Sequence, residues 1–253
     1  MMLHIPIQAN KKVFFLSDFH LGNPNDEVNR KKEKSIVAFL DSVKHETSAL
    51  FLVGDVFDFW FEYKYVVPKG FVRVLGKLAE FHDAGIPIHF FVGNHDMWSF
   101  TYFTEEFGAK MYYHPVDFQI GNKRFHIGHG DGLGPGDRNY KFLKLFFRNP
   151  FTQWLFSVLP ASIGMGIAHY WSKTSRAGNK DEKFWGEKEW LIQYCEELDA
   201  KNPFDYYLFG HRHHLMEHTL QSGGVYFNLG DWIQYNSYGE FDGNTFKIKQ
   251  FEK

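Results

Sequence analysis

Four short apolar stretches, each followed by residues that bind metal ions, constrain the fold of this sequence more than any other feature. They cover residues 13–16, 49–53, 88–92 and 206–209. Each is expected to form a buried strand, because short apolar runs bounded by turn residues are typical of strands in parallel sheets. Ligands of such sheets bind beyond the carboxyl ends of the strands. The sequence therefore predicts one edge of an α/β sheet at which chemistry takes place.

The residues that follow these four runs are mostly Asp, Asn and His. The segments are Ser17-Asp18-Phe19-His20, Gly54-Asp55, Gly93-Asn94-His95-Asp96 and Gly210-His211-Arg212-His213. Oxygen and imidazole ligands suit hard or borderline divalent metals better than thiophilic ones. Each segment alone is a modest signal, since buried histidines and turn aspartates are common in structural roles. Their joint occurrence at strand ends favours a metal centre in which Asp55 is shared between two ions.

The order of the remaining patterns indicates strands that alternate with helices. A first helix is indicated by apolar residues that recur on one face: Ile36, Phe39, Leu40 and Val43. A second is indicated over Phe71–Ala84. Because these helices alternate with the strands, the pattern favours a parallel sheet with right-handed crossovers. A hairpin is expected around Gly121-Asn122, with His126 as a strand residue. Further helices are expected over Met97–Phe107 and Glu182–Ala200, and further strands over residues 215–220, 225–229, 233–238 and 245–251. Two sheets flanked by helices, in a single domain of residues 1–253, accommodate these parts.

Composition narrows the classes of function. The formal net charge of −2 argues against bulk nucleic-acid binding, so we expect no nucleic-acid partner. The only cysteine, Cys195, excludes an intrachain disulfide and a metal cage built from thiolates, and we expect an ordinary thiol in a helix. Residues 1–12 contain no apolar run of signal-peptide length, which predicts a cytoplasmic location.

An insert without strand alternation occupies residues 137–176. Residues 149–172 contain no Asp, Glu, Lys or Arg and are rich in bulky apolar side chains, while six Lys or Arg flank them. Pro150 and Pro160, together with two glycines, argue against a membrane-spanning helix and favour two short helices around Pro160. A basic rim around an apolar middle suits an acyl-chain pocket or an interfacial helix pair. A helical hairpin packed on its own domain and a dimer contact are the alternatives.

The five polar segments together resemble the motif blocks of calcineurin-like metallophosphoesterases. The blocks are Asp18-x-His20, Gly54-Asp55-x-x-Asp58, Gly93-Asn94-His95-Asp96, Gly128-His129-Gly130-Asp131 and Gly210-His211-x-His213. The resemblance implies a four-layer αββα sandwich with a helical lid insert and a centre of two divalent metal ions. It implies that one ion is held by Asp18, His20, Asp55 and His213, and the other by Asp55, Asn94, His129 and His211.

Two residues beside these ligands are predicted to take part in catalysis. His95 is expected to protonate the leaving oxygen or to stabilise charge on the phosphoryl group. Asp58 is expected to fix the tautomer of His95. The alternative for Asp58 is a turn or helix-capping residue. Asn94 contributes a neutral oxygen, which limits negative charge where an anionic phosphate must bind.

With its insert, the chain resembles the UDP-2,3-diacylglucosamine hydrolase family of lipid A biosynthesis. This resemblance implies manganese-dependent attack of water on the α-phosphorus, which yields UMP and 2,3-diacylglucosamine 1-phosphate (lipid X), at the cytoplasmic face of the inner membrane. It also implies four residues, besides Asn94, that line the glucosamine and phosphate site: Asp137, Tyr140, Ser175 and Asn179.

Three positions depart from the pattern of that family. His95 stands where the family has Arg, Asp58 where it has Glu, and Arg212 where it has a small hydroxyl residue. A soluble metal-dependent phosphodiesterase or phosphatase, with the insert as a dimer surface, therefore remains as the second enzyme hypothesis. A third hypothesis is a non-catalytic adaptor, which is expected to lose metal ligands, whereas this sequence retains all seven.

Overall fold

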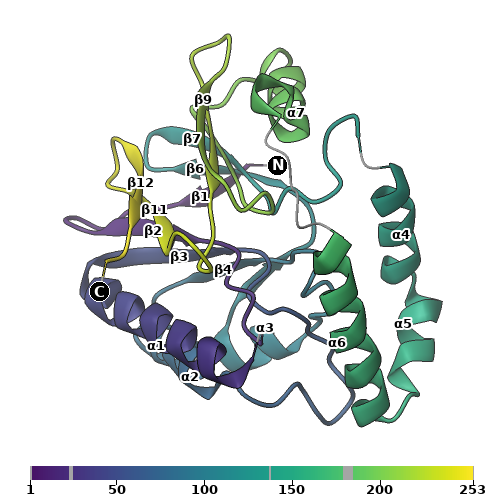
Figure 1. Ribbon diagram of the computed structural model, residues 1–253. Coiled ribbons are helices and arrows are strands. Elements are labelled where there is room, and N and C mark those ends of the chain that lie inside the picture. Colours follow the sequence, from purple (N-terminus) through teal and green to yellow (C-terminus); the bar gives the residue numbers. More distant parts are fainter. Residues whose placement is uncertain (1, 23–24, 137, 179–184, 253) are drawn as a thin grey trace.

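Two six-stranded sheets lie face to face in the computed structural model, which describes residues 2–22, 25–136, 138–178 and 185–252 (Figure 1). The first sheet has the order β1 (Leu3–Ile5), β6 (Val116–Ile120), β7 (Lys123–Ile127), β8 (Tyr206–Phe209), β10 (Val225–Leu229) and β9 (Leu215–Thr219). The second has the order β12 (Phe246–Gln250), β11 (Ser237–Phe241), β2 (Lys12–Leu16), β3 (Thr47–Val53), β4 (Ile88–Phe91) and β5 (Lys110–Tyr112).

The pairing of these strands brings their carboxyl ends together. Strands β2, β3, β4 and β5 are parallel to one another, and so are β7, β8 and β10 in the other sheet. The segments after β2, β3, β4, β7 and β8 carry the predicted metal ligands. Parallel pairing thus explains how residues far apart in the sequence reach one site.

Helices cover the outer face of each sheet. The second sheet packs against α1 (Asp26–Val43), α2 (Val72–Asp83) and α3 (Tyr102–Phe107), and the first packs against α7 (Trp190–Asp199). Figure 1 shows α7 on one side of the two sheets and α1 with α2 on the other. This arrangement confirms the predicted αββα sandwich.

The core between the sheets accounts for the large number of phenylalanines in this chain, which has 29. The ring of Phe15 stacks on Phe51, with centroids 4.9 Å apart, and on Phe125 across the sheets at 6.0 Å. All three side chains are buried. Aromatic pairs of this geometry contribute about 0.5–1.5 kcal/mol beyond the area that they bury. This rigid layer is the support for the loops that follow the strands.

Helix α1 illustrates how the local sequence defines these elements. The side chain of Asn25 caps it by accepting a hydrogen bond from the backbone of Val28 at 3.0 Å. Its predicted apolar face is buried, and it ends at Val43, after which a short 3-10 helix (Lys44–Glu46) begins. The buried carboxylate of Glu33 accepts from the backbone N–H of Arg73 at 2.9 Å, which ties α1 to α2. Replacing Asn25 with Ala is expected to cost about 1 kcal/mol of stability.

Three helices, which we call the cap, lie between β7 and β8. They are α4 (Arg138–Arg148), α5 (Pro150–Ser157) and α6 (Ala161–Gly178), grouped beside the sandwich in Figure 1. Asn149 caps α5 by accepting from the N–H of Phe151 at 2.8 Å, and Pro150 takes the first helical position. The prediction of two helices around Pro160 is confirmed, since α5 ends before it and α6 begins after it. Helix α6, with 18 residues, is longer than expected, because Gly164 and Gly166 lie inside it and a glycine there costs about 1 kcal/mol, too little to end a helix.

Other expectations differ from the structure for identifiable reasons. The helix predicted over Met97–Phe107 begins only at Tyr102, because the carboxylate of Glu62 accepts from the N–H groups of Phe100 and Thr101 at 2.7 and 2.8 Å. Helix α7 begins at Trp190, after a 3-10 helix (Gly186–Lys188), rather than at Glu182, which lies outside the described residues.

The strand expected over residues 233–238 begins at Ser237. Residues 233–235 instead form a turn in which Oδ1 of Asp231 accepts from the backbone of Ile233, Gln234 and Tyr235. The short strands β1 and β5 were not predicted, since three residues are too few for a periodic pattern. Among the described helices, none combines the length and the apolar character that a membrane span requires.

Candidate metal centre

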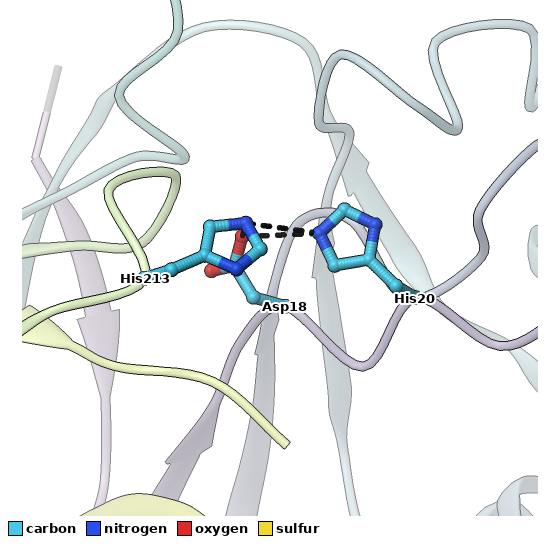
Figure 2. Close-up of side chains that lie close together, drawn as sticks. All are labelled: Asp18, His20 and His213. Carbon is cyan, nitrogen blue, oxygen red and sulfur yellow. Dashed lines mark hydrogen bonds and ion pairs between the residues drawn. The ribbon is translucent and has the colours of Figure 1, made fainter. Parts of the chain in front are cut away.

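Asp18, His20 and His213 form the first of three overlapping clusters of potential metal ligands among the described residues (Figure 2). Asp18 and His20 follow β2, and His213 follows β8. Nε2 of His20 lies 3.1 Å from Nε2 of His213, and these nitrogens lie 3.7 and 3.4 Å from Oδ1 of Asp18. Figure 2 shows the two rings facing each other beside the carboxylate. Three ligand atoms thus converge within the reach of one cation.

Asn94, His129 and His211 form the second cluster together with Asp55. Oδ1 of Asn94 lies 2.9 Å from Nδ1 of His211 and 3.2 Å from Nε2 of His129. Nε2 of His129 lies 3.2 Å from Oδ2 of Asp55. These residues come from the segments after β3, β4, β7 and β8, so the cluster joins both sheets.

Asp55 lies between the two clusters. Its Oδ2 is 3.2 Å from Nε2 of His129 in one cluster and 3.6 Å from Nε2 of His20 in the other. Its Oδ1 accepts a hydrogen bond from the backbone N–H of His95 at 2.8 Å. A single carboxylate oxygen therefore faces both clusters, and the structure brings all seven predicted ligands together.

In His20, His129 and His213 the ring nitrogen Nδ1 faces an oxygen atom outside the centre. The other ring nitrogen, Nε2, is therefore directed into the centre. Nδ1 of His129 lies 2.9 Å from the carbonyl oxygen of Val53 and therefore carries its proton there. Nδ1 of His213 lies 3.3 Å from Asp231 Oδ2, and Nδ1 of His20 lies 3.5 Å from Asp58 Oδ1. Oxygen atoms in these outer positions are typical of histidines that bind a metal.

The backbone at several of the ligands has positive φ angles, which residues other than glycine rarely adopt. Positive φ angles occur at Asp18, His20, Asp55, His211 and His213, with values of 55°, 44°, 51°, 69° and 53°. Each such residue costs roughly 1–3 kcal/mol, so the surrounding structure must enforce it. Strain of this kind concentrates at functional sites, and the sharp turns bring the side chains into the space beyond the strand ends.

One glycine is required by the close approach of two loops in the centre. A Cβ at Gly93 would lie 2.2 Å from Oδ1 of Asp55 and 2.5 Å from its backbone nitrogen. No rearrangement of a flexible side chain relieves contact with a backbone atom. Gly93 therefore allows the loop after β4 to lie against Asp55.

The electrostatics of the centre are those of a cation site. Burial raises the pKa of Asp18 to about 6 and, with the charge of Asp55, raises that of Asp96 to about 7. Burial opposes charge on His129, but the carboxylate of Asp55 outweighs it and raises the pKa of this ring to about 10. The carboxylates thus hold a positive charge on a buried imidazole, a role that a divalent cation can take over. The donor set of carboxylate, amide and imidazole groups fits such an ion.

His95 lies at the edge of both clusters. Its ring is perpendicular to that of His20, with centroids 4.7 Å apart. Its Nδ1 lies 2.9 Å from the backbone carbonyl oxygen of Asp58, whereas the carboxylate of Asp58 is 3.9 Å away. The main chain of Asp58, rather than its carboxylate, therefore fixes the tautomer of His95. The carboxylate lies closer to His20, at 3.5 Å.

The residues predicted to line the substrate site are only partly described. Tyr140, on α4, donates a hydrogen bond to Oδ2 of Asp131 at 2.6 Å, and its ring lies 6.4 Å from that of His211. Tyr140 thus lies beside the centre. Asp137 and Asn179 lie outside the described residues, and of Ser175 only the backbone, within α6, is described.

Comparison with known proteins identifies the family. The sequence pattern of the calcineurin-like phosphoesterases matches residues 11–215. The chain belongs to this family. Members of this family are metal-dependent phosphoester hydrolases, and the two clusters of metal-binding side chains agree with that activity.

Curated relatives cover nearly the whole chain. A UDP-2,3-diacylglucosamine hydrolase of Porphyromonas gingivalis is 39% identical over 95% of this chain and 98% of that protein. Proteins of the same name from Shewanella pealeana and Ectopseudomonas mendocina are 25% and 26% identical, over 89% and 95% of this chain and 92% and 98% of theirs. The likeness therefore includes the cap as well as the phosphoesterase motifs.

Two polar residues of this phosphoesterase were not predicted to support the centre. Asp231, which is buried, lies against His213, and Asp131 accepts from Tyr140 and Lys144 of α4. A signal for Asp231 was present, because Gly230-Asp231 follows β10 as Gly54-Asp55 follows β3. The role of Asp131 depends on the cap, whose position the sequence does not show.

Proposed function

We propose that the chain cleaves the pyrophosphate of UDP-2,3-diacylglucosamine and releases UMP and 2,3-diacylglucosamine 1-phosphate, also called lipid X. The observation that carries this proposal is the 39% identity to a protein named UDP-2,3-diacylglucosamine hydrolase, which extends over the motifs and the cap. In this reaction water attacks the α-phosphorus, the bond between the α-phosphorus and the bridging oxygen breaks, and the sugar phosphate leaves with that oxygen.

Two divalent ions, manganese in our proposal, are held by the seven ligands. Asp18, His20, Asp55 and His213 hold one, and Asp55, Asn94, His129 and His211 hold the other. A bound pair of ions supplies a water with a pKa near neutrality and a clamp for the oxygens of an in-line displacement. The neutral amide of Asn94 keeps the negative charge of the ligand set low, which favours an anionic substrate.

In this proposal His95 neutralises negative charge that develops on the reacting phosphate or on the leaving oxygen. The carbonyl oxygen of Asp58 can only accept a hydrogen bond, so Nδ1 of His95 carries a proton there. The other ring nitrogen, Nε2, is then the atom that interacts with the substrate. In its charged form the ring donates to the leaving oxygen or stabilises the phosphoryl oxygens. Its side chain is 19% exposed, which allows contact with a substrate.

The cap provides the specificity for a lipid. Large apolar side chains on α4, α5 and α6 are half-exposed or more, among them Phe142, Phe151, Trp154 and Ile163. Burial of such surface against acyl chains stabilises a complex by roughly 25 cal/mol per Å². We further propose that Asp137, Tyr140, Ser175 and Asn179 contact the glucosamine and its phosphate.

The same apolar surface would rest on the cytoplasmic face of the inner membrane, where a diacylated substrate resides. The basic residues of α4 contribute less than expected, because Lys141, Lys144 and Arg148 bond to oxygen atoms of the sandwich and of the chain segment that precedes α4. Membrane contact in our proposal therefore depends on apolar burial rather than on a basic rim.

A product assay tests this function. Purified chain, manganese and UDP-2,3-diacylglucosamine are incubated in isotopically labelled water, and the products are analysed by mass spectrometry. We expect labelled UMP, unlabelled lipid X and little turnover of the deacylated analogue. Labelled lipid X would place the attack on the other phosphorus and contradict the mechanism. Equal turnover of both substrates would favour the soluble phosphodiesterase, with the exposed face of the cap as a dimer contact.

A further inference from the structure

Arg212 separates two metal-ligand histidines in the loop after β8. His211 belongs to one cluster and His213 to the other. The guanidinium of Arg212 contacts the carboxylate of Glu189 through two bonds, Nε to Oε2 and Nη2 to Oε1, both at 3.0 Å. Two parallel bonds between an arginine and a carboxylate fix direction as well as distance. The pair therefore restrains the middle of a loop whose two neighbours bind different ions.

Glu189 is itself held in place. It is the N-cap residue of α7, and its side chain is only 3% exposed. Its Oε1 also accepts the backbone N–H of Trp185, at 2.9 Å. The carboxylate is thus fixed by the main chain on one side before it meets Arg212 on the other. It is a rigid anchor rather than a mobile surface charge.

The loop needs such an anchor because it is strained. His211 and His213 both have positive φ angles, 69° and 53°. The start of the loop is fixed, since the carbonyl oxygen of Gly210 accepts from Nδ2 of the buried Asn228 at 2.5 Å. Beyond that point, the backbone N–H of His211 donates to the carboxylate of Asp18 at 3.0 Å and that of Arg212 to the carbonyl oxygen of Gly210 at 2.8 Å, while the bidentate pair holds the side chain of Arg212. Loss of the pair removes the side-chain restraint between the two rings, so we expect their positions relative to the other ligands to become less fixed.

We propose that Arg212 and Glu189 are positioning residues that hold His211 and His213 in the geometry required to bind both metal ions. The inference rests on the proposed function, because it concerns the same two-metal centre. Lysine cannot replace Arg212 in this role, since an ammonium is a point charge without the planar fork. The pair also stands apart from the ligands, so its removal takes away no ligand atom.

Three variants separate positioning from mere stability: Arg212→Met, Glu189→Gln and the double variant. Arg212→Met leaves the buried carboxylate of Glu189 without this cation, and Glu189→Gln removes the negative charge beside the partly buried guanidinium of Arg212, so the Tm of the metal-free protein falls in both. The double variant removes both charges and regains much of that Tm. Manganese affinity, measured by calorimetry, is expected to fall by roughly 10–100-fold in all three, as for other residues that orient metal ligands. Weak binding in a double variant of restored stability is the result specific to positioning.

Lys123 and Asp205 provide a matched control. Their ion pair, at 2.8 Å, lies at the start of β7, at the opposite end of this strand from His129. The double variant Lys123→Met with Asp205→Asn should leave manganese affinity unchanged. Wild-type affinity in the Glu189→Gln and Arg212→Met double variant would overturn the inference. If the wild type itself failed to bind two manganese ions, the proposed function would fail instead.

Discussion

The metal centre and the cap differ in which side chains they bury: the centre buries polar groups, whereas the cap exposes large apolar ones. In the centre, polar side chains such as Asp18, Asp55 and His129 are at most 3% exposed and face one another. In the cap, large apolar side chains such as Phe142 and Tyr170 are 75% and 74% exposed. Buried polar groups are costly unless they are paired, and large exposed apolar patches mark binding surfaces. The centre is thus organised before a substrate binds, whereas the cap has apolar surface left for a partner.

The attachment of the cap to the sandwich explains how these two regions cooperate. Lys144 and Tyr140 of α4 both bond to the carboxylate of Asp131, two residues from the ligand His129. The ring of Phe156 on α5 lies 4.7 Å from Trp98, which follows His95 by three residues. The cap therefore contacts the segments that carry catalytic groups, although its outer face remains free of the sandwich.

The largest effect is expected from the residue that joins the clusters. In Asp55→Asn the shared carboxylate is lost, so neither ion is held well. Loss of metal catalysis costs several kcal/mol of transition-state stabilisation, or about 10³-fold or more in kcat/KM. The value of kcat/KM should fall by the same factor for acylated and water-soluble substrates, because the cap is unchanged. A variant that retained a tenth of wild-type turnover would show that Asp55 is not shared.

His95→Ala is expected to lower kcat by about 10²–10⁴-fold on both kinds of substrate, as for other positioned acids and bases. Manganese content, measured by elemental analysis, should stay the same. A parallel loss of manganese would make His95 a metal ligand, since one of its ring nitrogens lies within 4.8 Å of a ring nitrogen of His20 and of a carboxylate oxygen of Asp55. Asp58→Asn keeps the carbonyl oxygen that holds His95 but changes the carboxylate beside His20, so we expect a smaller loss of kcat together with weaker manganese binding.

A third prediction separates the cap from the centre. The substitutions Trp154→Asp and Leu155→Asp on α5 replace two exposed apolar side chains with charged ones. Each apolar side chain is worth about 1.5–3 kcal/mol when buried, so losing both costs roughly 10²–10⁴-fold in binding. We expect this loss in kcat/KM for the acylated substrate and none for a water-soluble phosphodiester. Ser162→Asp adds charge at an exposed polar position of α6 and should change neither. Equal losses on both substrates would show that the cap is only part of the fold.

A smaller effect is expected from the carboxylate behind His213. Asp231→Asn weakens the group that orients this ring, at a distance of 3.3 Å. Residues in this position typically contribute 10–100-fold to metal affinity, about the loss we expect by calorimetry with manganese. Asp242→Asn, at an exposed turn, is the control and should bind manganese normally. Normal binding by Asp231→Asn would limit the role of Asp231 to the turn that follows it.

The smallest effect concerns a buried histidine outside both regions. Burial, with the charge of Lys110, lowers the pKa of His89 from 6.5 to about 3. Between these values only the unfolded chain binds the proton, so the free energy of unfolding rises with pH by up to about 1.4 kcal/mol per unit. His89→Phe should flatten this slope in urea titrations of metal-free protein between about pH 4.5 and 6.5. An unchanged slope would mean that His89 is protonated in the folded chain.

The ligands of the centre could be predicted from the sequence, and the contacts of the cap could not. Asp18, Asp55 and His211 follow apolar runs that form parallel strands, so a local pattern determines that they meet. Tyr140 contacts Asp131 only because α4 returns to the sandwich, which no local pattern encodes. The carbonyl oxygen of Asp58 was missed for a related reason, since every residue has one and only geometry selects it.

In our proposal one carboxylate, that of Asp55, joins two metal ions in this chain. The decisive measurement uses wild-type protein that is stripped with a chelator and reloaded with manganese: the bound ions are counted, and the paramagnetic resonance spectrum is recorded. We expect two ions per chain whose spins are coupled, because ions that share a ligand lie about 3.5–4 Å apart. One ion per chain, or two ions without coupling, would contradict it.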